Sequence, residues 1–366
     1  MKVLLVTDDL FPGGVQRHVT DLANRLSESG HDVAVAAAGG SFRKRLCNAV
    51  RFHDVPLARG SHRTFVNATR AVKELIRIVR EGEFDILHSH MRYSDLFGRI
   101  CALLAGIGHV STCHSIFTNH RWSSVFGYQI IAPSQAVKQV LVELYGKPPA
   151  SVTVIYNDPY PMAKIAPQRL RDLKKQYGID RTSTTLFSIS RFVHEKDIAT
   201  SLQALSLLRK QGIKSLKYFL VGYGELHDSI LRLIRSLGLE EWVHILPGTS
   251  DVGEVIGMSD AGVLSSRSEG GIPYVILEAA SLGKPVVASA TAATMEFVRH
   301  GDNGMLYPVG DAAGLAACVQ QLVRNRALRV QLGRQALKKY RDYHAANRSL
   351  EYTLAVYEKV RARARG

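Results

Sequence analysis

Two glutamates flank a glycine-rich turn in the stretch SEGGIPYVILEAASLGKPVVAS, residues 268–289. Glu269 precedes the turn and Glu278 follows it. Pro273 suits the first turn of a helix because its φ is fixed and it lacks an N–H, so the residues after it are expected to be helical. Carboxylates accept hydrogen bonds from hydroxyls, whereas a helix N-terminus attracts phosphate. A nucleotide sugar has hydroxyls at both ends and phosphates between them, so it would use both features.

The start of this helix is expected to bind the nucleotide sugar, the donor of the sugar group, partly through its main chain. Free amides at a helix N-terminus point toward a ligand, and the glycines let it approach closely. The alternative is an ordinary loop-to-helix junction whose glutamates face solvent. The donor-binding residues expected in this segment are Gly270, Gly271, Ile272, Tyr274, Val275 and Glu278.

Two basic residues, Arg191 and Lys196, follow a predicted strand in the stretch SISRFVHEKD. Arg and Lys at a strand end can hold a diphosphate leaving group and stabilise the charge that develops on it. The chain contains no D-x-D triplet, so this diphosphate site is expected to work without a metal. Ordinary surface charges are the alternative.

Two further patterns are compatible with a site but are less specific. His88 and His90 could begin a metal site, but the sequence shows no third ligand beside them, so they are expected to be polar residues at a strand end. Gly222 and Gly224 form a lone G-x-G, which is typical of a tight turn near a base or ribose, and also of a plain turn.

Strands alternate with helices of ten or more residues, which predicts an α/β fold of two doubly wound parallel sheets. Ligands in such sheets bind beyond the carboxyl ends of the strands. Three prolines in residues 157–167 indicate a linker between two domains. The predicted strands cover residues 2–7, 31–39, 85–90, 109–115, 127–134 and 151–157 before the linker, and 184–191, 217–224, 242–248, 261–266, 284–289 and 304–307 after it. The predicted helices include residues 15–30, with Gly30 at the end, 69–81, 95–105, 135–145 and 273–283, and the chain is expected to be helical from residue 312 onward.

Composition limits the location of the protein. Its 366 residues, 46% of them hydrophobic, favour two domains of ordinary size. The cysteines have no C-x-x-C pair or metal-ligand spacing, so they are expected to be reduced and mostly buried, which favours the cytoplasm. The start of the chain is too short an apolar run for a signal or a membrane span. The four cysteines are Cys47, Cys101, Cys113 and Cys318.

The formal net charge of +15 bears on which molecules the protein could bind. Residues 41–80 contain ten basic and two acidic residues, so this segment could face the inner surface of an anionic membrane, a phosphorylated substrate or simply solvent. No nucleic-acid partner is expected, because interleaved aromatics and a recognition motif are absent from the sequence. The ten basic residues are Arg43, Lys44, Arg45, Arg51, Arg59, Arg63, Arg70, Lys73, Arg77 and Arg80.

The motifs resemble, in combination, those of the retaining glycosyltransferases of family 4, which have the GT-B architecture. The resemblance covers nearly the whole chain, from the GG loop after the first strand through DILHSH, TCHS, APS, VIYN, SRFVHEKD, VGYGE and the segment with the two glutamates to GDNGMLYPVGD. It implies two Rossmann-like domains facing a central cleft: an acceptor-binding domain (1–160) and a nucleotide-sugar domain (161–340). A C-terminal helix (341–366) then returns to the first domain.

The resemblance also implies roles for single residues. Gly13 and Gly14 let the first loop approach the donor phosphates, and His114 lies beside the transferring sugar. Arg191 and Lys196 grip the diphosphate. Glu269 contacts the donor sugar and Glu278 the ribose hydroxyls, although eight residues separate these glutamates here and seven do so in the family. YNDPY also replaces the Asn-Gly that many relatives have after the last strand of the first domain.

The activity implied by the resemblance is transfer of a sugar, with retention and without a metal. The donor is a nucleoside-diphosphate sugar, such as a UDP-sugar, and the acceptor is a cell-envelope polysaccharide, a glycolipid or a small molecule. The alternative is a sugar-nucleotide epimerase or a phosphorylase on the same scaffold, since a fold does not determine a function.

Overall fold

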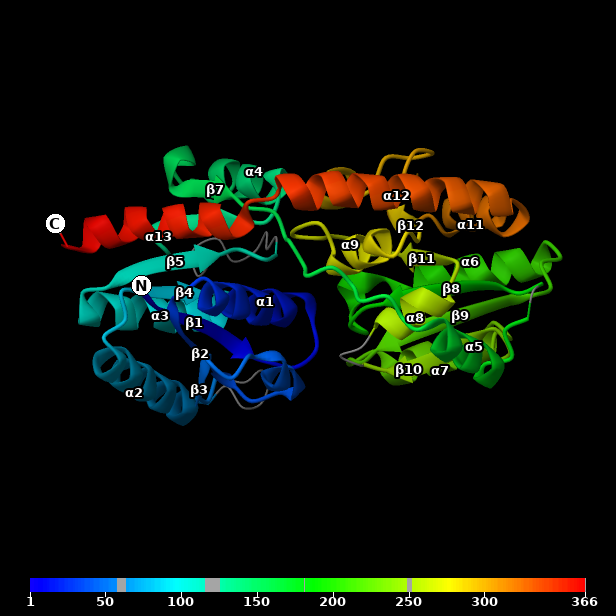
Figure 1. Ribbon diagram of the computed structural model, residues 1–366. Helices are drawn as coiled ribbons and strands as arrows, with labels where there is room; N and C mark the ends of the chain where they lie inside the picture. The colour runs from blue at the N-terminus through cyan, green and yellow to red at the C-terminus, as the bar shows by residue number, and fades with distance from the viewer. Residues whose placement is uncertain (58–63, 116–125, 181, 249–251, 366) are drawn as a thin grey trace. The chain divides into compact units, whose positions relative to one another are not determined.

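The computed structural model describes residues 1–57, 64–115, 126–180, 182–248 and 252–365, which form two compact units (Figure 1). The N-terminal unit comprises Met1–Pro159 and Asn347–Gly366, and the C-terminal unit comprises Tyr160–Ala346. Each contains one fully parallel sheet covered by helices, so the predicted pair of doubly wound sheets is confirmed. None of the described helices has an apolar stretch long enough to cross a bilayer.

The N-terminal sheet has the strand order β3-β2-β1-β4-β5-β6-β7. Strands β2 and β3 are added in order on one side of β1, and β4 and the later strands are added on its other side. The pair β1 and β4 is therefore the topological switch point. The elements of this unit are β1 (Lys2–Asp9), α1 (Gly14–Glu28), β2 (Asp32–Ala38), η1 (Ser41–Arg45), β3 (Arg51–Asp54), α2 (Phe65–Gly82), β4 (Ile86–Ser89), α3 (Arg92–Ala105), β5 (Gly108–Thr112), β6 (Gln129–Ala132), α4 (Gln135–Glu143), η4 (Pro149–Ser151), β7 (Val152–Val154) and α13 (Ser349–Arg365).

Alternate side chains of β1 enter two separate hydrophobic cores. Val3 and Leu5 pack in the core that contains α1 and α13, whereas Leu4 and Val6 pack in the core that contains α2 and α3. A strand buried on both faces is apolar at every position, because successive side chains point to opposite sides. This explains the continuous apolar run VLLV, residues 3–6, near the start of the chain.

The last helix, α13, packs on β4 and β5 of the N-terminal sheet although the whole C-terminal unit precedes it in the chain. Val356, Tyr357 and Val360 are its buried contacts with this core. Arg25 of α1 pairs with Asp158 at 2.6 Å, and Ser349 donates to the same carboxylate at 3.3 Å. The predicted return of the C-terminal helix to the first domain is therefore confirmed.

The C-terminal sheet has the strand order β10-β9-β8-β11-β12-β13, with its switch point between β8 and β11. Its elements are α5 (Pro167–Gln176), β8 (Thr184–Ile189), η5 (His194–Lys196), α6 (Ile198–Lys210), β9 (Leu216–Gly222), α7 (His227–Ser236), β10 (Val243–Pro247), α8 (Gly253–Met258), β11 (Ala261–Leu264), α9 (Tyr274–Ser281), β12 (Val286–Ser289), α10 (Ala292–Met295), β13 (Met305–Tyr307), α11 (Ala312–Arg324) and α12 (Arg326–Ala346).

Three details differ from the predicted elements. The edge strand β3 was not predicted, because its four residues are exposed or only half-buried and have no apolar pattern. Helix α2 begins at Phe65 rather than Thr69, since the Thr64 side chain caps it by accepting from the Asn67 N–H at 3.2 Å. Helix α9 begins one residue later than predicted, with Pro273 as its N-cap.

Candidate active site

The switch point of the C-terminal sheet is occupied by an ion pair. Lys196 ends η5, directly after β8, and Glu269 lies in the loop that follows β11. The Lys196 Nζ atom is 2.5 Å from Glu269 Oε1, and the two side chains are only 22% and 12% exposed. Two residues that are 73 positions apart in the sequence thus meet where ligands of doubly wound sheets bind.

Hydrogen bonds join the two loops that carry this pair. The Ser265 hydroxyl donates to the Lys196 carbonyl at 2.9 Å and accepts from the Ser201 hydroxyl at 2.9 Å. The Arg267 N–H donates to the Glu195 carbonyl at 2.8 Å. The main chain around Lys196 is therefore fixed by the loop that follows β11 as well as by its own connection to β8.

Asp197 turns the chain sharply after Lys196. Its φ of 43° places it in the left-handed region, which a non-glycine residue enters at a cost of about 1–2 kcal/mol. Its carboxylate accepts from Thr200 Oγ1 at 2.9 Å and pairs with Arg267 Nη2 at 3.1 Å, and both contacts offset that cost. Asp is one of the few residues other than glycine that enter this region.

Glu278 lies inside α9 and is 6% exposed. Gly270, Gly271 and Ile272, which precede this helix, are buried, and Tyr274 is half-buried. Neither Glu269 nor Glu278 is a solvent-facing side chain, so the alternative of an ordinary junction with exposed glutamates is wrong. With eight residues between the two glutamates, both side chains remain little exposed.

Arg191 follows β8 and is exposed, with no ion-pair partner among the described residues. Gly222 and Gly224 at the end of β9 pack against the same segment. A Cβ atom at Gly222 would lie 1.9 Å from the Ser190 carbonyl oxygen, and one at Gly224 would lie 2.4 Å from the Phe192 carbonyl oxygen. The G-x-G therefore lets β9 approach the loop that carries Arg191, a steric role that the motif alone did not identify.

The first loop of the N-terminal unit follows β1 at the switch point of its sheet. Asp9 fixes this loop, since its Oδ1 accepts from the Phe11 N–H at 3.1 Å and from Gln16 Nε2 at 3.0 Å. Gly14 begins α1, and a Cβ atom there would meet no atom within 4 Å, whereas one at Gly13 would meet Gln16 Oε1 at 2.5 Å. The space beside Gly14 is thus open at the start of a helix.

Four histidines gather near the same switch point. His90 Nδ1 lies 3.3 Å from His114 Nε2, and the ring of His18 lies 4.8 Å from that of His114 between centroids. His88 packs behind His90, with ring centroids 4.1 Å apart. Burial lowers the pKa of His18 to about 4, and burial lowers the pKa values of the other three well below the ordinary value. All four imidazoles are therefore neutral at pH 7.

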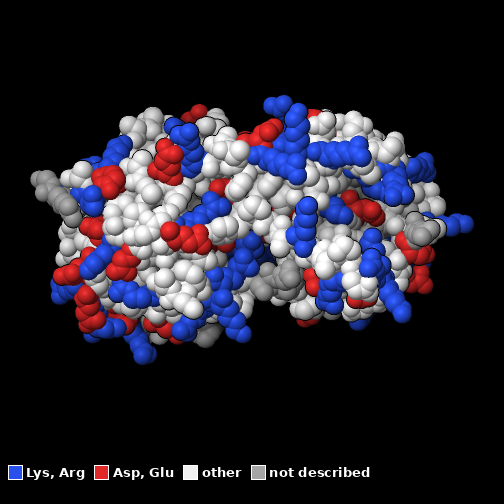
Figure 2. Space-filling model, viewed as in Figure 1, with Lys and Arg blue, Asp and Glu red and all other residues white. Residues whose placement is uncertain are grey.

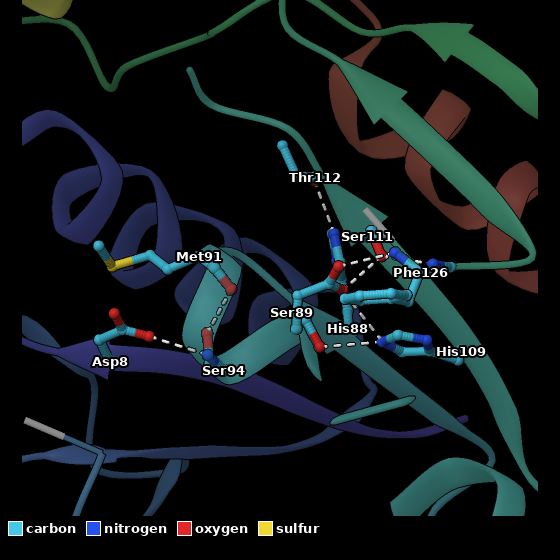
Figure 3. Close-up of polar contacts among 11 residues, drawn as sticks. Asp8, His88, Ser89, Met91, Ser94, His109, Ser111, Thr112 and Phe126 are labelled. Carbon is cyan, nitrogen blue, oxygen red and sulfur yellow. Dashed lines mark hydrogen bonds and ion pairs between the residues drawn. The ribbon is translucent and has the colours of Figure 1, made fainter. Parts of the chain in front are cut away.

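His88 differs from the other three because both of its nitrogens are used inside the protein. Its Nδ1 bonds to the Tyr357 hydroxyl at 2.7 Å. Its Nε2 bonds to Thr112 Oγ1 at 2.7 Å (Figure 3). His88 is thus a buried structural residue, as expected for a polar residue at a strand end. His90 instead belongs to a cluster with His18 and His114, which no spacing in the sequence indicated.

A buried carboxylate organises the end of β5, which leads to His114. Asp95 accepts hydrogen bonds from the Ser111 hydroxyl and, at 2.8 Å, from the Phe126 N–H. Ser111 also accepts from the Gly127 N–H at 2.7 Å, and His109 bonds to the Ser89 hydroxyl at 3.0 Å (Figure 3). This network joins α3, β4 and β5 to the chain that follows residue 125. No pattern in the sequence indicated it, because its members are isolated polar residues.

Comparisons with known proteins match both units of the chain. Residues 171–339 match the family model Glycosyl transferases group 1, and residues 12–157 match Glycosyltransferase Family 4. The chain is 28% identical over 363 residues to N-acetyl-alpha-D-glucosaminyl L-malate synthase of Bacillus anthracis, with 93% of each chain covered. It is 28% identical over 368 residues to phosphatidyl-myo-inositol mannosyltransferase of Mycobacterium leprae, with 95% of this chain and 94% of that one covered.

Solved structures show the same fold. The crystal structure of Anabaena HepE in complex with UDP-glucose aligns with a TM-score of 0.84 at 23% identity and covers 97% of this chain and 99% of that one. The two family models together match most of the sequence, one in each unit. The chain therefore belongs to the family 4-like glycosyltransferases with the GT-B fold.

Proposed function

We propose that the protein transfers a sugar, with retention and without a metal, from a UDP-sugar to a glycan, a glycolipid or a small-molecule acceptor. The observation that carries this proposal is the Lys196–Glu269 pair at the switch point of the C-terminal sheet, with buried Glu278 on the following helix. The pair offers a cation for phosphate and a carboxylate for sugar hydroxyls in one place. The HepE crystal structure contains UDP-glucose, which favours UDP as the first nucleotide to test.

The proposed reaction breaks the bond between the sugar C1 and the phosphate oxygen and forms a bond from C1 to the acceptor oxygen on the same face. The departing phosphate oxygen takes the proton of the acceptor hydroxyl. Lys196 and Arg191 stabilise the negative charge on the leaving diphosphate. Glu269 binds the donor sugar and Glu278 the ribose hydroxyls, so neither is required to form a covalent intermediate. In the N-terminal unit, Gly13 and Gly14 approach the phosphates.

Three further assignments complete the proposed site. His114 lies beside the transferring sugar, and its low pKa makes it a neutral hydrogen-bonding group there. Gly222 holds the loop of Arg191, and the start of α9 supplies the main chain that faces the donor. The residues proposed at that start are Gly270, Gly271, Ile272, Tyr274 and Val275.

A donor screen tests the proposed function. We expect UDP or a UDP-sugar to raise the melting temperature of the protein more than GDP-, ADP- or dTDP-sugars do, because a ligand that binds only the folded state stabilises it. The donor that binds is then radiolabelled and incubated with and without acceptors. If the protein is a transferase, it consumes the labelled donor only when an acceptor is present. Conversion of the sugar without an acceptor, or a requirement for free phosphate, would instead support the epimerase or the phosphorylase, which the transferase and synthase names of the relatives do not favour.

The N-terminal unit also offers a surface for an anionic membrane. Arg70, Lys73 and Arg80 are exposed on α2, which packs against α3, and α3 exposes Leu103 (55%) and Leu104 (61%). Figure 2 shows Lys and Arg side chains interspersed with Asp and Glu on the viewed face. Arg59 and Arg63 of the basic segment lie outside the described residues. Basic residues on one helix and exposed leucines on the helix packed against it are the residue types of a surface that binds anionic lipid headgroups, so we propose peripheral attachment here.

Vesicle sedimentation tests this attachment. We expect the protein to sediment with vesicles of about 30% anionic phospholipid and not with purely zwitterionic ones, because each basic residue near the surface contributes about 1 kcal/mol. The double variant Leu103→Ser/Leu104→Ser should sediment less, while Val330→Ser, a change of an exposed apolar residue in the C-terminal unit, should not differ from the wild type. Equal sedimentation with both kinds of vesicle would contradict an electrostatic surface.

A further inference from the structure

Three histidines of the N-terminal unit converge on one point. His18 comes from α1, His90 directly follows β4, and His114 follows β5. One ring nitrogen from each can be chosen so that all three lie within 4.8 Å of one another. The three ring centroids are separated by 4.8, 5.4 and 5.5 Å, so the rings form a nearly equilateral triangle.

We propose that His18, His90 and His114 form a binding site for a transition-metal ion, best filled by Zn²⁺. Imidazole nitrogens are good ligands for Zn²⁺, Co²⁺ and Ni²⁺, whereas Mg²⁺ and Ca²⁺ prefer oxygen. Three protein ligands leave the fourth tetrahedral position for water or a substrate oxygen. This site is a binding site for an ion and is not required by the proposed transfer reaction.

The distances fit a tetrahedral ion after a small adjustment. With Zn–N bonds of about 2.0–2.1 Å, ligand nitrogens lie about 3.3 Å apart. His90 Nδ1 and His114 Nε2 already have this separation, 3.3 Å. His18 is half-buried on a helix, so rotation of its side chain can bring its nitrogen about 1.5 Å closer without moving the sheet.

His90 is 1% exposed and offers Nδ1 as its ligand atom, because this nitrogen faces His114 Nε2. Its Nε2 then carries the ring proton and has no hydrogen-bond partner among the described residues. His88 does not compete for the ion, because Tyr357 and Thr112 occupy both of its nitrogens, and its ring instead supports that of His90.

Metal binding would change the availability of His114. If His114 lies beside the transferring sugar, as in the proposed transfer reaction, an ion on its imidazole removes it from that role, and Zn²⁺ should inhibit turnover. This consequence rests on the proposed function, whereas binding of the ion does not. Binding measured directly therefore separates failure of the metal site from failure of the proposed reaction.

The test is calorimetric titration of the chelator-treated, full-length protein with ZnCl₂ and, separately, with MgCl₂. We expect one Zn²⁺ per chain with a dissociation constant in the micromolar range or below, and no heat of binding with Mg²⁺. CoCl₂ should give the intense visible absorption of a tetrahedral site with nitrogen ligands. Absence of Zn²⁺ binding at about 100 μM, or an octahedral Co²⁺ spectrum, would overturn the proposal.

Single-histidine variants assign the site. His114→Ala and His18→Ala should each weaken Zn²⁺ binding by more than the roughly 10–100-fold that loss of an outer-shell partner costs. His300→Ala, which removes an exposed histidine of the C-terminal unit, is the matched control and should bind like the wild type. Circular dichroism checks the fold of each variant, and His18→Asn replaces any variant that does not fold, since this half-buried position tolerates a polar side chain. Equal Zn²⁺ affinity in the wild type and in the folded His18 variant would overturn the assignment.

Discussion

The variant Lys196→Ala is expected to lose about 10²–10³-fold in kcat, which is the loss seen when a preorganised group that stabilises transition-state charge is removed. The effect should fall on kcat more than on donor affinity, because the charge on the leaving diphosphate grows only as the bond to the sugar breaks. Lys196 is poised for this role by the Ser265 hydrogen bond to its carbonyl and by its pairing with Glu269. The measurement is release of UDP at saturating donor and acceptor.

Two further variants separate the chemical effect of Lys196 from a structural one. Lys196→Ala leaves Glu269 in the interior without its partner, so the double variant Lys196→Ala/Glu269→Gln removes both charges and should be more stable than the single variant. We expect it to regain melting temperature but not kcat. Lys210→Ala changes an exposed lysine on the following helix and should keep wild-type kcat. Recovery of kcat in the double variant would contradict a role for Lys196 in catalysis.

The variant Glu278→Gln is expected to raise the dissociation constant of UDP by about 10–100-fold. A hydrogen bond to a charged group contributes about 1.5–3 kcal/mol, and the amide replaces the carboxylate with nearly the same shape. Glu278 is 6% exposed within α9, so little water competes for its oxygens. Calorimetric titration of UDP into each protein gives the two constants.

The matched control for Glu278 is Glu254→Gln. Glu254 belongs to the same unit and pairs with Arg169 on the surface at 2.7 Å. Its replacement should leave UDP affinity unchanged. Unchanged UDP affinity in a folded Glu278→Gln protein would contradict the contact with the ribose.

Hydrophobic patterns predicted most of the fold because both sheets are buried on both faces. Strands such as β1 and β9 contain a continuous apolar run, and the helices between them have one apolar face, so the element type followed from the pattern of residues. Gly30 was predicted to end α1, and its φ of 81° confirms this. The edge strand β3 lacks such a pattern, since its position depends on pairing with β2 rather than on burial of its own side chains.

The candidate site was predictable where loops at neighbouring strand ends carry charged residues. Arg191, Lys196 and Glu269 were identified because each follows a recognisable strand. The contact between Lys196 and Glu269 was not predicted, because the order of strands in the sheet, which makes β8 and β11 neighbours, cannot be read from local sequence. The cluster of His18 with His90 and His114 was missed for the same reason, as it depends on the adjacency of β1, β4 and β5.

The return of α13 to the N-terminal unit has a consequence for biosynthesis. Tyr357 fills part of the core that contains α1 and α13, and it bonds to His88. The ribosome nevertheless makes this residue only after all of Tyr160–Ala346. A nascent chain stopped after Pro159 lacks Val356, Tyr357 and Val360, which cover part of this core, and it leaves His88 Nδ1 without its phenol partner. The first unit to emerge is therefore the last to be completed, and part of its apolar core stays uncovered until α13 has been made.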